Sequence, residues 1–470
     1  MSEQKVKFGR LIFVLCLAEL VCSLETNMIN LALSELYGIY KDPVRVGWIV
    51  TAFTLTAATC AVVGARLGDI YGRRKVLVIM LMIAFAGSVI SFSSHDFDII
   101  ILGRVLQGAS MAVLPLCYGL LREFVPSDKI ASGVGLLSGV YVGGVAVALL
   151  AGGVVLDHFR WQGIFLVSAG CALLAIILIL AVVPPSAPVS KSRTVDYWGA
   201  LLLMPGIALP MLGLDRLGKN GWATPEPWAL LVTGIGLLVL WVRHERNHPD
   251  PLVDLSQFRS PPIVAAYLAM MASYTGPSLF AIILLPLLTQ PAWTIVGLGL
   301  TATAAAMLKI PANILCAFAG ALNGYLTRRF GAPQVAAAAA LAITLTYIGL
   351  IFRHDSVWLI GFAMVFGFAI PLVVMWAALT TTIITLSPPE KATEAAGVLQ
   401  VTKSLGYAIG AQTIAMLLSR SSVSQGGLTF PSESAYLLAF GFCGILAFVA
   451  MILALSAGRQ TAVARETATL

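Results

Sequence analysis

Long apolar segments recur along the whole chain, and they constrain the fold more than any other feature. Each is close to the roughly 20 residues that an α-helix needs to cross a bilayer. Of the 470 residues, 59% are hydrophobic and only 11% are charged, whereas a soluble chain carries about 25% charged residues. The sequence therefore predicts an all-α polytopic membrane protein. We predict fourteen spans at residues 10–33, 47–68, 76–94, 99–121, 130–154, 161–183, 197–214, 227–243, 262–289, 294–318, 333–352, 356–386, 394–418 and 434–457.

The seventh and eighth predicted spans are the weakest of this set. Pro205 and Pro210 interrupt the seventh, and a proline inside a helix removes a hydrogen bond. The apolar part of the eighth, from Trp228 to Val242, has only 15 residues. A count of twelve spans therefore stays open.

The distribution of lysine and arginine predicts the orientation. With fourteen spans, most of the basic loops fall on one side, which is cytoplasmic by the positive-inside rule. Both termini are then cytoplasmic. We expect a monomer in the lipid bilayer of a bacterial cytoplasmic (inner) membrane. Because the basic residues are spread over short loops and form no single patch, no nucleic-acid partner is expected.

Two polar, proline-containing segments divide the chain, one after the sixth span and one at residues 243–262. They predict two six-helix bundles with two additional helices between them. The predicted boundaries are an N-terminal bundle at 1–183, a linker with the two inserted helices at 184–260, a C-terminal bundle at 261–458 and a cytoplasmic tail at 459–470.

An internal repeat supports two related bundles. The loop after the second span, residues 65–74, reads Ala-Arg-Leu-Gly-Asp-Ile-Tyr-Gly-Arg-Arg, and residues 324–331 read Gly-Tyr-Leu-Thr-Arg-Arg-Phe-Gly. A leucine, a charged residue and a glycine keep the same spacing at an offset of 259 residues. Weak internal repeats of this kind, related by a pseudo-two-fold axis, are typical of two-bundle transporters.

Five short motifs resemble a known family. Residues 69–74 look like the signature loop of the major facilitator superfamily, and residues 24–33 are similar to the first-helix signature of its fourteen-helix drug:proton antiporter branch. Residues 104–108 (Arg-Val-Leu-Gln-Gly) resemble the fourth-helix signature. Residues 196–199 and 251–254 resemble the flanks of the two extra helices. The resemblance covers essentially the whole chain and implies transport by alternating access.

The sequence departs from that branch at several positions. Glu25 stands where an aspartate is usual, Ser34 where a proline is usual, and Ala65 replaces a glycine of the loop. Residues 148–153 (Ala-Leu-Leu-Ala-Gly-Gly) lack the proline expected in the fifth helix of antiporters. These departures concern the direction of transport and leave the expected fold unchanged.

Five ionisable residues lie deep in the predicted spans: Glu19, Glu25, Arg104, Lys309 and Lys403. A charge at such depth is costly and is by default a functional hypothesis. At 1.5 Å per residue, Glu25 lies about 13 Å and Arg104 about 8 Å from the outer ends of their helices, so their long side chains can meet. The resemblance implies that the helices carrying these charges line the central cavity.

These residues predict a proton-coupling site and a substrate site. Burial favours a neutral carboxylate and a nearby arginine favours an ionised one, so a glutamate between these effects can bind and release a proton. We assign proton coupling to Glu25, Glu19 and Arg104. The proton is the coupling ion, and no cofactor is expected. The predicted substrate-binding residues are Lys309, Lys403, Asn27, Asn30, Gln107 and Asn313.

The two repeated loops are predicted to gate the transporter. A charge at the end of a helix can latch one bundle to the other and bias the inward-closed state. The predicted gating residues are Asp69, Gly72, Arg73, Arg74, Arg328 and Gly331.

The first functional hypothesis is proton-coupled efflux of an amphipathic organic compound. The deep lysines favour an anionic or zwitterionic one. The alternative is proton-coupled uptake of an organic anion, and a remote alternative is a membrane sensor that transports nothing. No phosphate-binding loop is present, so transport driven by ATP is not expected. No predicted span carries a His-Glu-x-x-His, Gly-x-Ser-x-Gly or paired-aspartate motif, so we do not expect an enzyme.

Overall fold

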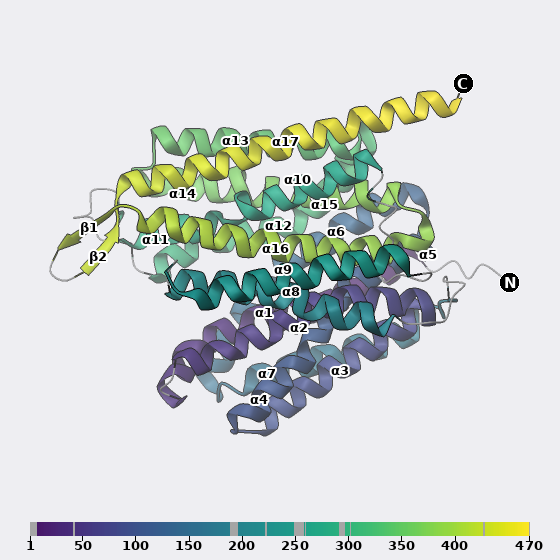
Figure 1. Ribbon diagram of the computed structural model, residues 1–470, viewed down its shortest axis with the longest axis horizontal. Coiled ribbons are helices and arrows are strands. Elements are labelled where there is room, and N and C mark those ends of the chain that lie inside the picture. Colours follow the sequence, from purple (N-terminus) through teal and green to yellow (C-terminus); the bar gives the residue numbers. More distant parts are fainter. Residues whose placement is uncertain are drawn as a thin grey trace. The chain divides into compact units, whose positions relative to one another are not determined.

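The computed structural model is almost entirely helical, as the apolar segments predict (Figure 1). Among the residues that the structure describes, one β-hairpin pairs β1 (Ser422–Gln425) with β2 (Leu428–Pro431), with Val423 opposite Phe430. The structure describes residues 7–40, 43–188, 196–220, 223–248, 258, 260–290, 297–300, 302–425 and 428–469. These residues form two compact units.

Unit 1 comprises residues 1–208, 235–255 and 384–401. Its α1 packs along α6, and α3 packs against both α4 and α7. The helices up to the first linker are α1 (Phe8–Tyr40), α2 (Pro43–Tyr71), α3 (Arg73–Ser93), α4 (Phe97–Gln107), the 3₁₀ turn η1 (Gly108–Ala112), α5 (Val113–Phe124), α6 (Ser127–His158) and α7 (Gly163–Val182).

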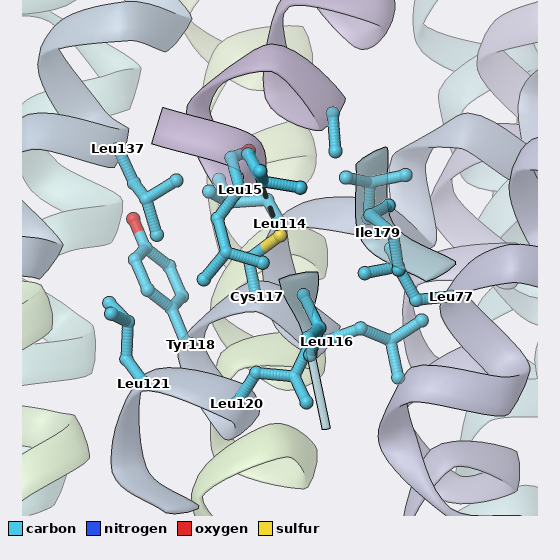
Figure 2. Close-up of a cluster of buried hydrophobic side chains, with 14 of the residues drawn as sticks. Leu15, Leu77, Leu114, Leu116, Cys117, Tyr118, Leu120, Leu121, Leu137 and Ile179 are labelled. Carbon is cyan, nitrogen blue, oxygen red and sulfur yellow. Dashed lines mark hydrogen bonds between the residues drawn. The ribbon is translucent and has the colours of Figure 1, made fainter. Parts of the chain in front are cut away.

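One apolar core of unit 1 is built from leucine, valine, alanine and isoleucine side chains, many of them on α1, α3 and α5. Figure 2 shows part of it around Leu15, Leu116 and Cys117, all fully buried. The Cys117 thiol points at the backbone oxygen of Leu15, 3.9 Å away. Tyr118 adds a large buried ring, and its hydroxyl is hydrogen-bonded to Ser138 at 3.1 Å. The Cys117 contact joins α5 to α1, which carries the predicted proton site, and the Tyr118 hydrogen bond joins α5 to α6.

Unit 2 comprises residues 209–234, 256–383 and 402–470. In it α17 packs along α13 and α10 (Figure 1). Its helices are α10 (Pro261–Thr275), η3 (Pro277–Leu279), α11 (Phe280–Thr289), α12 (Ala302–Phe330), α13 (Ala332–Phe352), α14 (Val357–Phe362), the π-helical η5 (Ala363–Ala369) and α17 (Glu433–Thr469).

Four helices contribute to both units. They are α8 (Tyr197–Asn220), α9 (Pro225–Asn247), α15 (Ile370–Leu386) and α16 (Ala392–Ser419), with the 3₁₀ turn η6 (Pro389–Lys391) before α16. Helices α8 and α9 lie side by side. In unit 1 Gly206 packs on Leu238, and in unit 2 Gly234 packs on Pro210. The predicted domain boundaries remain predictions.

Prolines inside three other predicted spans differ in their effect on the helix. The predicted span 262–289 breaks at Gly276-Pro277, where η3 separates α10 from α11. Pro371 has no backbone N–H and therefore cannot donate a hydrogen bond to a carbonyl of the preceding turn. The helix before it widens into the π-helical η5. Pro311 lies inside α12, which continues through it.

The predicted spans lie largely on helix, although α12 begins only at Ala302 within the predicted span 294–318, and the count of fourteen is not established. Among the described residues, eleven helical segments are long and apolar enough to cross a membrane. Residues 198–214 and 311–320 form shorter apolar segments. Helix α16 is not among these because polar side chains, Lys403 included, lower its hydropathy. Fourteen spans therefore remain a prediction, while the all-helical membrane fold holds.

Candidate functional site

Glu25 belongs to a closed ring of hydrogen bonds in unit 1. Ser88 Oγ donates to Glu25 Oε1 at 3.1 Å, and Gln107 Nε2 donates to Ser88 Oγ at 2.7 Å. Arg104 Nη1 donates to Gln107 Oε1 at 2.7 Å and to the backbone oxygen of Glu25 at 3.1 Å. We call these four residues the Glu25 cluster. All are buried, with at most 2% of each residue exposed.

The side chains of Arg104 and Glu25 are therefore joined through Gln107 and Ser88. None of the ion pairs within 4.0 Å among the described residues connects their side chains. Arg104 is held instead by Nε donating to the backbone oxygen of Ile49 at 3.0 Å and by the Phe53 ring, whose centre is 4.4 Å from its guanidinium carbon. Carbonyl acceptors and an aromatic face can hold a buried guanidinium without direct ion pairing.

The cluster's order has a chemical consequence. Each donor along the chain Arg104, Gln107, Ser88 points towards the Glu25 carboxylate. Such a chain stabilises negative charge at its end, because hydrogen bonds in series polarise one another. A proton that reaches Glu25 would turn an acceptor into a donor, and the chain would have to rearrange.

Glycines bring α3 and α4 of the cluster together and set the adjoining η1 against α2. A side chain on Gly87 would meet the backbone oxygen of Gly103 at 2.5 Å, so α3 and α4 touch backbone to backbone. A side chain on Gly108 would meet Thr56 at 2.6 Å, which places η1 directly against α2. Small residues permit such close approach between membrane helices. Ser88 follows the first of these glycines, and Gln107 precedes the last.

The other predicted polar residues of α1 lie apart from this ring. Glu19 is fully buried and lies near Cys117 and Tyr118. Asn27 Nδ2 donates to the backbone oxygen of Ser23 at 2.8 Å, within its own helix. The side chain of Asn30 is not among those that the structure describes.

In unit 2 a second cluster surrounds Lys403, which is 8% exposed. Its Nζ lies 5.9 Å from the centre of the Tyr274 ring, and that ring stacks on Trp376 at 4.7 Å with an interplanar angle of 27°. Trp376 Nε1 donates to Ser273 Oγ at 3.1 Å. We call Ser273, Tyr274, Trp376 and Lys403 the aromatic cluster.

The break in the tenth helix positions this aromatic cluster. Tyr274 lies just before Gly276, where α10 ends. Gly406 of α16 packs against the backbone of Met271, which brings Lys403 beside α10. Asn313 is buried in α12, while the side chain of Lys309 lies outside the described residues.

The predicted gating loop forms a second buried polar centre in unit 1. Arg73 is 2% exposed, and both its Nε and Nη2 lie 3.0 Å from Asp69 Oδ1. Its Nη1 donates to the backbone oxygen of Gly119 at 3.1 Å, and its Nη2 to that of Glu390 at 3.4 Å. Nearby, Arg122 Nη2 donates to the backbone oxygen of Ser387 at 3.3 Å. Two arginines therefore bind carbonyls of residues 384–401.

The repeat of this loop keeps the turn and loses the charge pair. Gly72 and Gly331 both have a positive φ, of 95° and 86°, which only glycine adopts readily. By the offset of 259 residues, Arg328 replaces Asp69 and Ala332 replaces Arg73. No acid therefore stands at the equivalent position.

The remaining arginines of the two loops lie nearer the surface. Arg328 and Arg329 are exposed, and Arg329 Nη1 donates to the Tyr325 hydroxyl at 3.2 Å. In the first loop, Arg74 Nη2 donates to the backbone oxygen of Leu180 at 2.6 Å.

Sequence reasoning missed Ser88 and a group of metal-ligand residues. Ser88 and Ser91 lie three residues apart in an apolar span, beside Gly87, and this polar stripe was a usable signal. The sequence His-Glu-x-x-His does occur, at His244 to His248, just beyond the end of the eighth predicted span.

Comparison with known proteins identifies the family. Residues 15–411 match the profile described as Major Facilitator Superfamily. The chain therefore belongs to this superfamily of membrane transporters. It is an integral membrane protein and not an enzyme.

Relatives and solved structures agree with this assignment. The chain is 24% identical over 404 residues to multidrug resistance protein Stp of Mycobacterium tuberculosis, covering 84% of this chain and 73% of that protein. It is 27% identical over 367 residues to a uridine/deoxyuridine transporter of Lactococcus lactis, covering 74% of each.

Two solved structures share the fold at low identity. The human organic anion transporter MFSD10 has a TM-score of 0.67 at 14% identity, covering 94% of this chain and 99% of that one. The proton:xylose symporter XylE has a TM-score of 0.64 at 13% identity, covering 96% and 94%. At these identities the likeness concerns the fold alone.

Proposed function

We propose that the protein is a secondary active transporter that exports an amphipathic organic compound in exchange for protons by alternating access. The buried Glu25 cluster is the observation that carries this proposal. A relative named for multidrug resistance is consistent with efflux. In this proposal the chain acts as a monomer in a bacterial cytoplasmic membrane, with both termini in the cytoplasm and fourteen spans.

The exchange follows from charge balance at the cluster. When Glu25 is ionised, the nearby Arg104 offsets its charge through Gln107 and Ser88. When Glu25 takes a proton, the buried arginine loses its counter-charge, and an uncompensated buried charge is strongly unfavourable. The protonated and ionised states therefore favour different arrangements of α1, α3 and α4. Alternating access can couple to that difference, because proton binding then shifts the population of conformations.

The aromatic cluster is the proposed contact for the substrate. Stacked Tyr274 and Trp376 rings offer flat apolar faces, and Lys403 offers a positive charge with little exposure. A planar compound with an acidic group fits this chemistry. This is why we propose an anionic or zwitterionic amphipathic substrate.

The gating loop is the proposed latch. Residues 384–401 belong to the predicted C-terminal bundle by sequence, yet they pack in unit 1. The arginines at 73 and 122 donate to backbone oxygens of that segment. Release of these bonds would free the adjoining ends of α15 and α16, as alternation between inward-closed and inward-open states requires.

Transport in membrane vesicles tests the proposal. A thermal-shift screen over planar anions, zwitterions and cations first selects a ligand that stabilises the purified protein. Everted and right-side-out vesicles are then given an imposed pH gradient with this ligand. Everted vesicles that are acidic inside should accumulate the ligand, and a protonophore should abolish the accumulation.

The alternative is proton-coupled uptake of an organic anion, which the buried Lys403 favours. It predicts accumulation in right-side-out vesicles that are acidic outside. Ligand binding with no transport in either type of vesicle would contradict both hypotheses and favour the remote alternative, a membrane sensor.

A further inference from the structure

Three potential metal ligands meet where α8 begins and α9 ends. They are Asp196, His244 and His248, and one ligand atom of each lies within 4.8 Å of the others. Both ends belong to unit 1. His244 lies in the last turn of α9, and His248 directly follows the helix, with its backbone N–H donating to the backbone oxygen of His244 at 2.9 Å, so the two residues lie one turn apart.

The contacts between these side chains are close and directed. His244 Nε2 lies 2.9 Å from Asp196 Oδ1 and 2.8 Å from Oδ2. The two imidazole rings are 5.2 Å apart, centre to centre, with an angle of 38° between them. Two ligand atoms that each lie 2.0–2.1 Å from a tetrahedral zinc ion are about 3.3 Å from one another. The His244 nitrogen and the Asp196 oxygens therefore need to move apart by only about half an ångström to bind the ion between them.

The local fold positions the aspartate and leaves room beside it. Asp196 caps α8, with the backbone N–H of Gly199 donating to Oδ1 at 2.8 Å. A side chain on Gly199 would collide with Asp196 Oδ2 and would lie 2.9 Å from Glu245 Oε1. The two carboxylates therefore face the same space, which the missing side chain keeps open.

Charge favours a divalent cation there. Asp196 is 4% exposed and Glu245 is 3% exposed, so two carboxylates beside the two imidazole rings are removed from water. Buried carboxylates need counter-charge. A divalent ion supplies two positive charges, equal to the charge of both acids together.

We propose that Asp196, His244 and His248 bind one divalent transition-metal ion of the zinc type. Imidazole nitrogens and a carboxylate oxygen are ligands of this ion, and the spacing His-Glu-x-x-His places two of them on one helix face. Glu245, next to His244 in sequence, borders the same space beside Gly199 and adds a second negative charge to the site. The bound ion ties the start of α8 to the end of α9, so its role is to hold the inserted helix pair together. The inference concerns metal binding and goes beyond the proposed transport function.

Direct metal titration tests the site. The full chain, purified with a tag that contains no histidine and stripped with EDTA, is titrated with Zn²⁺ by calorimetry and with Co²⁺ by visible absorption. We expect one equivalent of each, with a Kd of about 1 µM or tighter, and Co²⁺ bands of a four- or five-coordinate site. Zn²⁺ should also raise the unfolding temperature.

Two variants separate metal binding from simple helix capping. Asp196→Asn keeps a side chain that caps helices but weakens the ligand, and His248→Ala leaves the cap untouched. Each should lower Zn²⁺ affinity by at least about tenfold and remove the thermal shift. Loss of a residue that only hydrogen-bonds to a metal ligand already lowers metal affinity by about 10- to 100-fold. His158→Ala, an exposed histidine on α6, is the matched control and should bind Zn²⁺ like the wild type.

Two results would overturn the proposal. One is the absence of stoichiometric Zn²⁺ binding to the wild-type protein. The other is equal binding by the wild type, Asp196→Asn and His248→Ala, because the metal would then be adventitious. In the first case, the variant His244→Ala shows what the residues do instead. If it lowers the unfolding temperature in EDTA, His244 and Asp196 form a stabilising pair without a metal ion.

Discussion

Buried charge is stabilised differently in the two units. In unit 1 Glu25 and Arg104 belong to a ring of hydrogen bonds that passes through Ser88 and Gln107. In unit 2 Lys403 lies over the face of Tyr274, 5.9 Å from the ring centre. The hydrogen bonds of the first arrangement depend on where each proton lies, so it suits proton binding. The stacked rings and the lysine of the second arrangement suit the binding of a flat, charged ligand. Substitutions in the two clusters should therefore have different effects on transport.

Removal of Arg104 should have the largest effect. In Arg104→Ala, Glu25 keeps its buried carboxylate without the nearby cation, and loss of one partner of a buried pair costs about 3–5 kcal/mol. The free energy of unfolding in detergent should fall by about that amount, and proton-driven transport should be lost. Arg353→Ala, which removes an exposed arginine, is the control. A stability within about 1 kcal/mol of the wild type would show that the ring does not need its cation.

Lys403→Met should separate ligands by charge. The variant keeps the length of the side chain and removes its charge, and a hydrogen bond to a charged group contributes about 1.5–3 kcal/mol. Affinity for a planar carboxylate should fall about 10- to 100-fold, while a planar amine of equal size should bind as before. Ligand-induced thermal shifts measure both, with exposed Lys75→Met as control. Equal losses for the two ligands would make this lysine structural.

Ser88→Ala should change the pH dependence of transport and leave ligand affinity intact. The hydroxyl donates to Glu25, so its loss removes about 1–2 kcal/mol of stabilisation from the ionised carboxylate. At 1.36 kcal/mol per pH unit, the midpoint of the pH profile should move up by about one unit. The sign follows because the variant favours the protonated form. An unchanged midpoint, with Ser91→Ala as control, would remove Ser88 from proton coupling.

Trp376→Phe should have the smallest effect. The ring remains able to stack on Tyr274, and only the hydrogen bond from Nε1 to Ser273 Oγ is lost. A net contribution of about 0.5–1 kcal/mol predicts a KM about two- to fivefold higher. The pH midpoint should not move. A shifted midpoint would contradict the separation of the two clusters.

The sequence was most informative where one residue type decides the structure. Apolar segments predicted helices, and the repeated glycines predicted the turns at Gly72 and Gly331, because few other residues adopt a positive φ. Buried ionisable residues were found by depth alone. The position of a residue along its span does not predict which side chain it contacts, because contacts depend on how each helix is rotated and packed against its neighbours.

Two features illustrate that limit. Ser88 lies on the predicted span 76–94, which carries no deep charge, yet close packing at Gly87 brings its hydroxyl to Glu25. Arg73 was expected to act through charge, and the structure adds backbone oxygens of residues 119 and 390, which carry no sequence signal at all.

Transport by Glu25→Gln protein reconstituted in proteoliposomes tests proton coupling most directly. Two reactions are compared, exchange of labelled ligand across the membrane without a pH gradient and accumulation driven by a pH gradient, with Asp355→Asn as the exposed control. If Glu25 carries the coupled proton, exchange persists in the variant while accumulation is lost. Accumulation equal to that of the wild type, with its full dependence on pH, would show that the proton moves elsewhere.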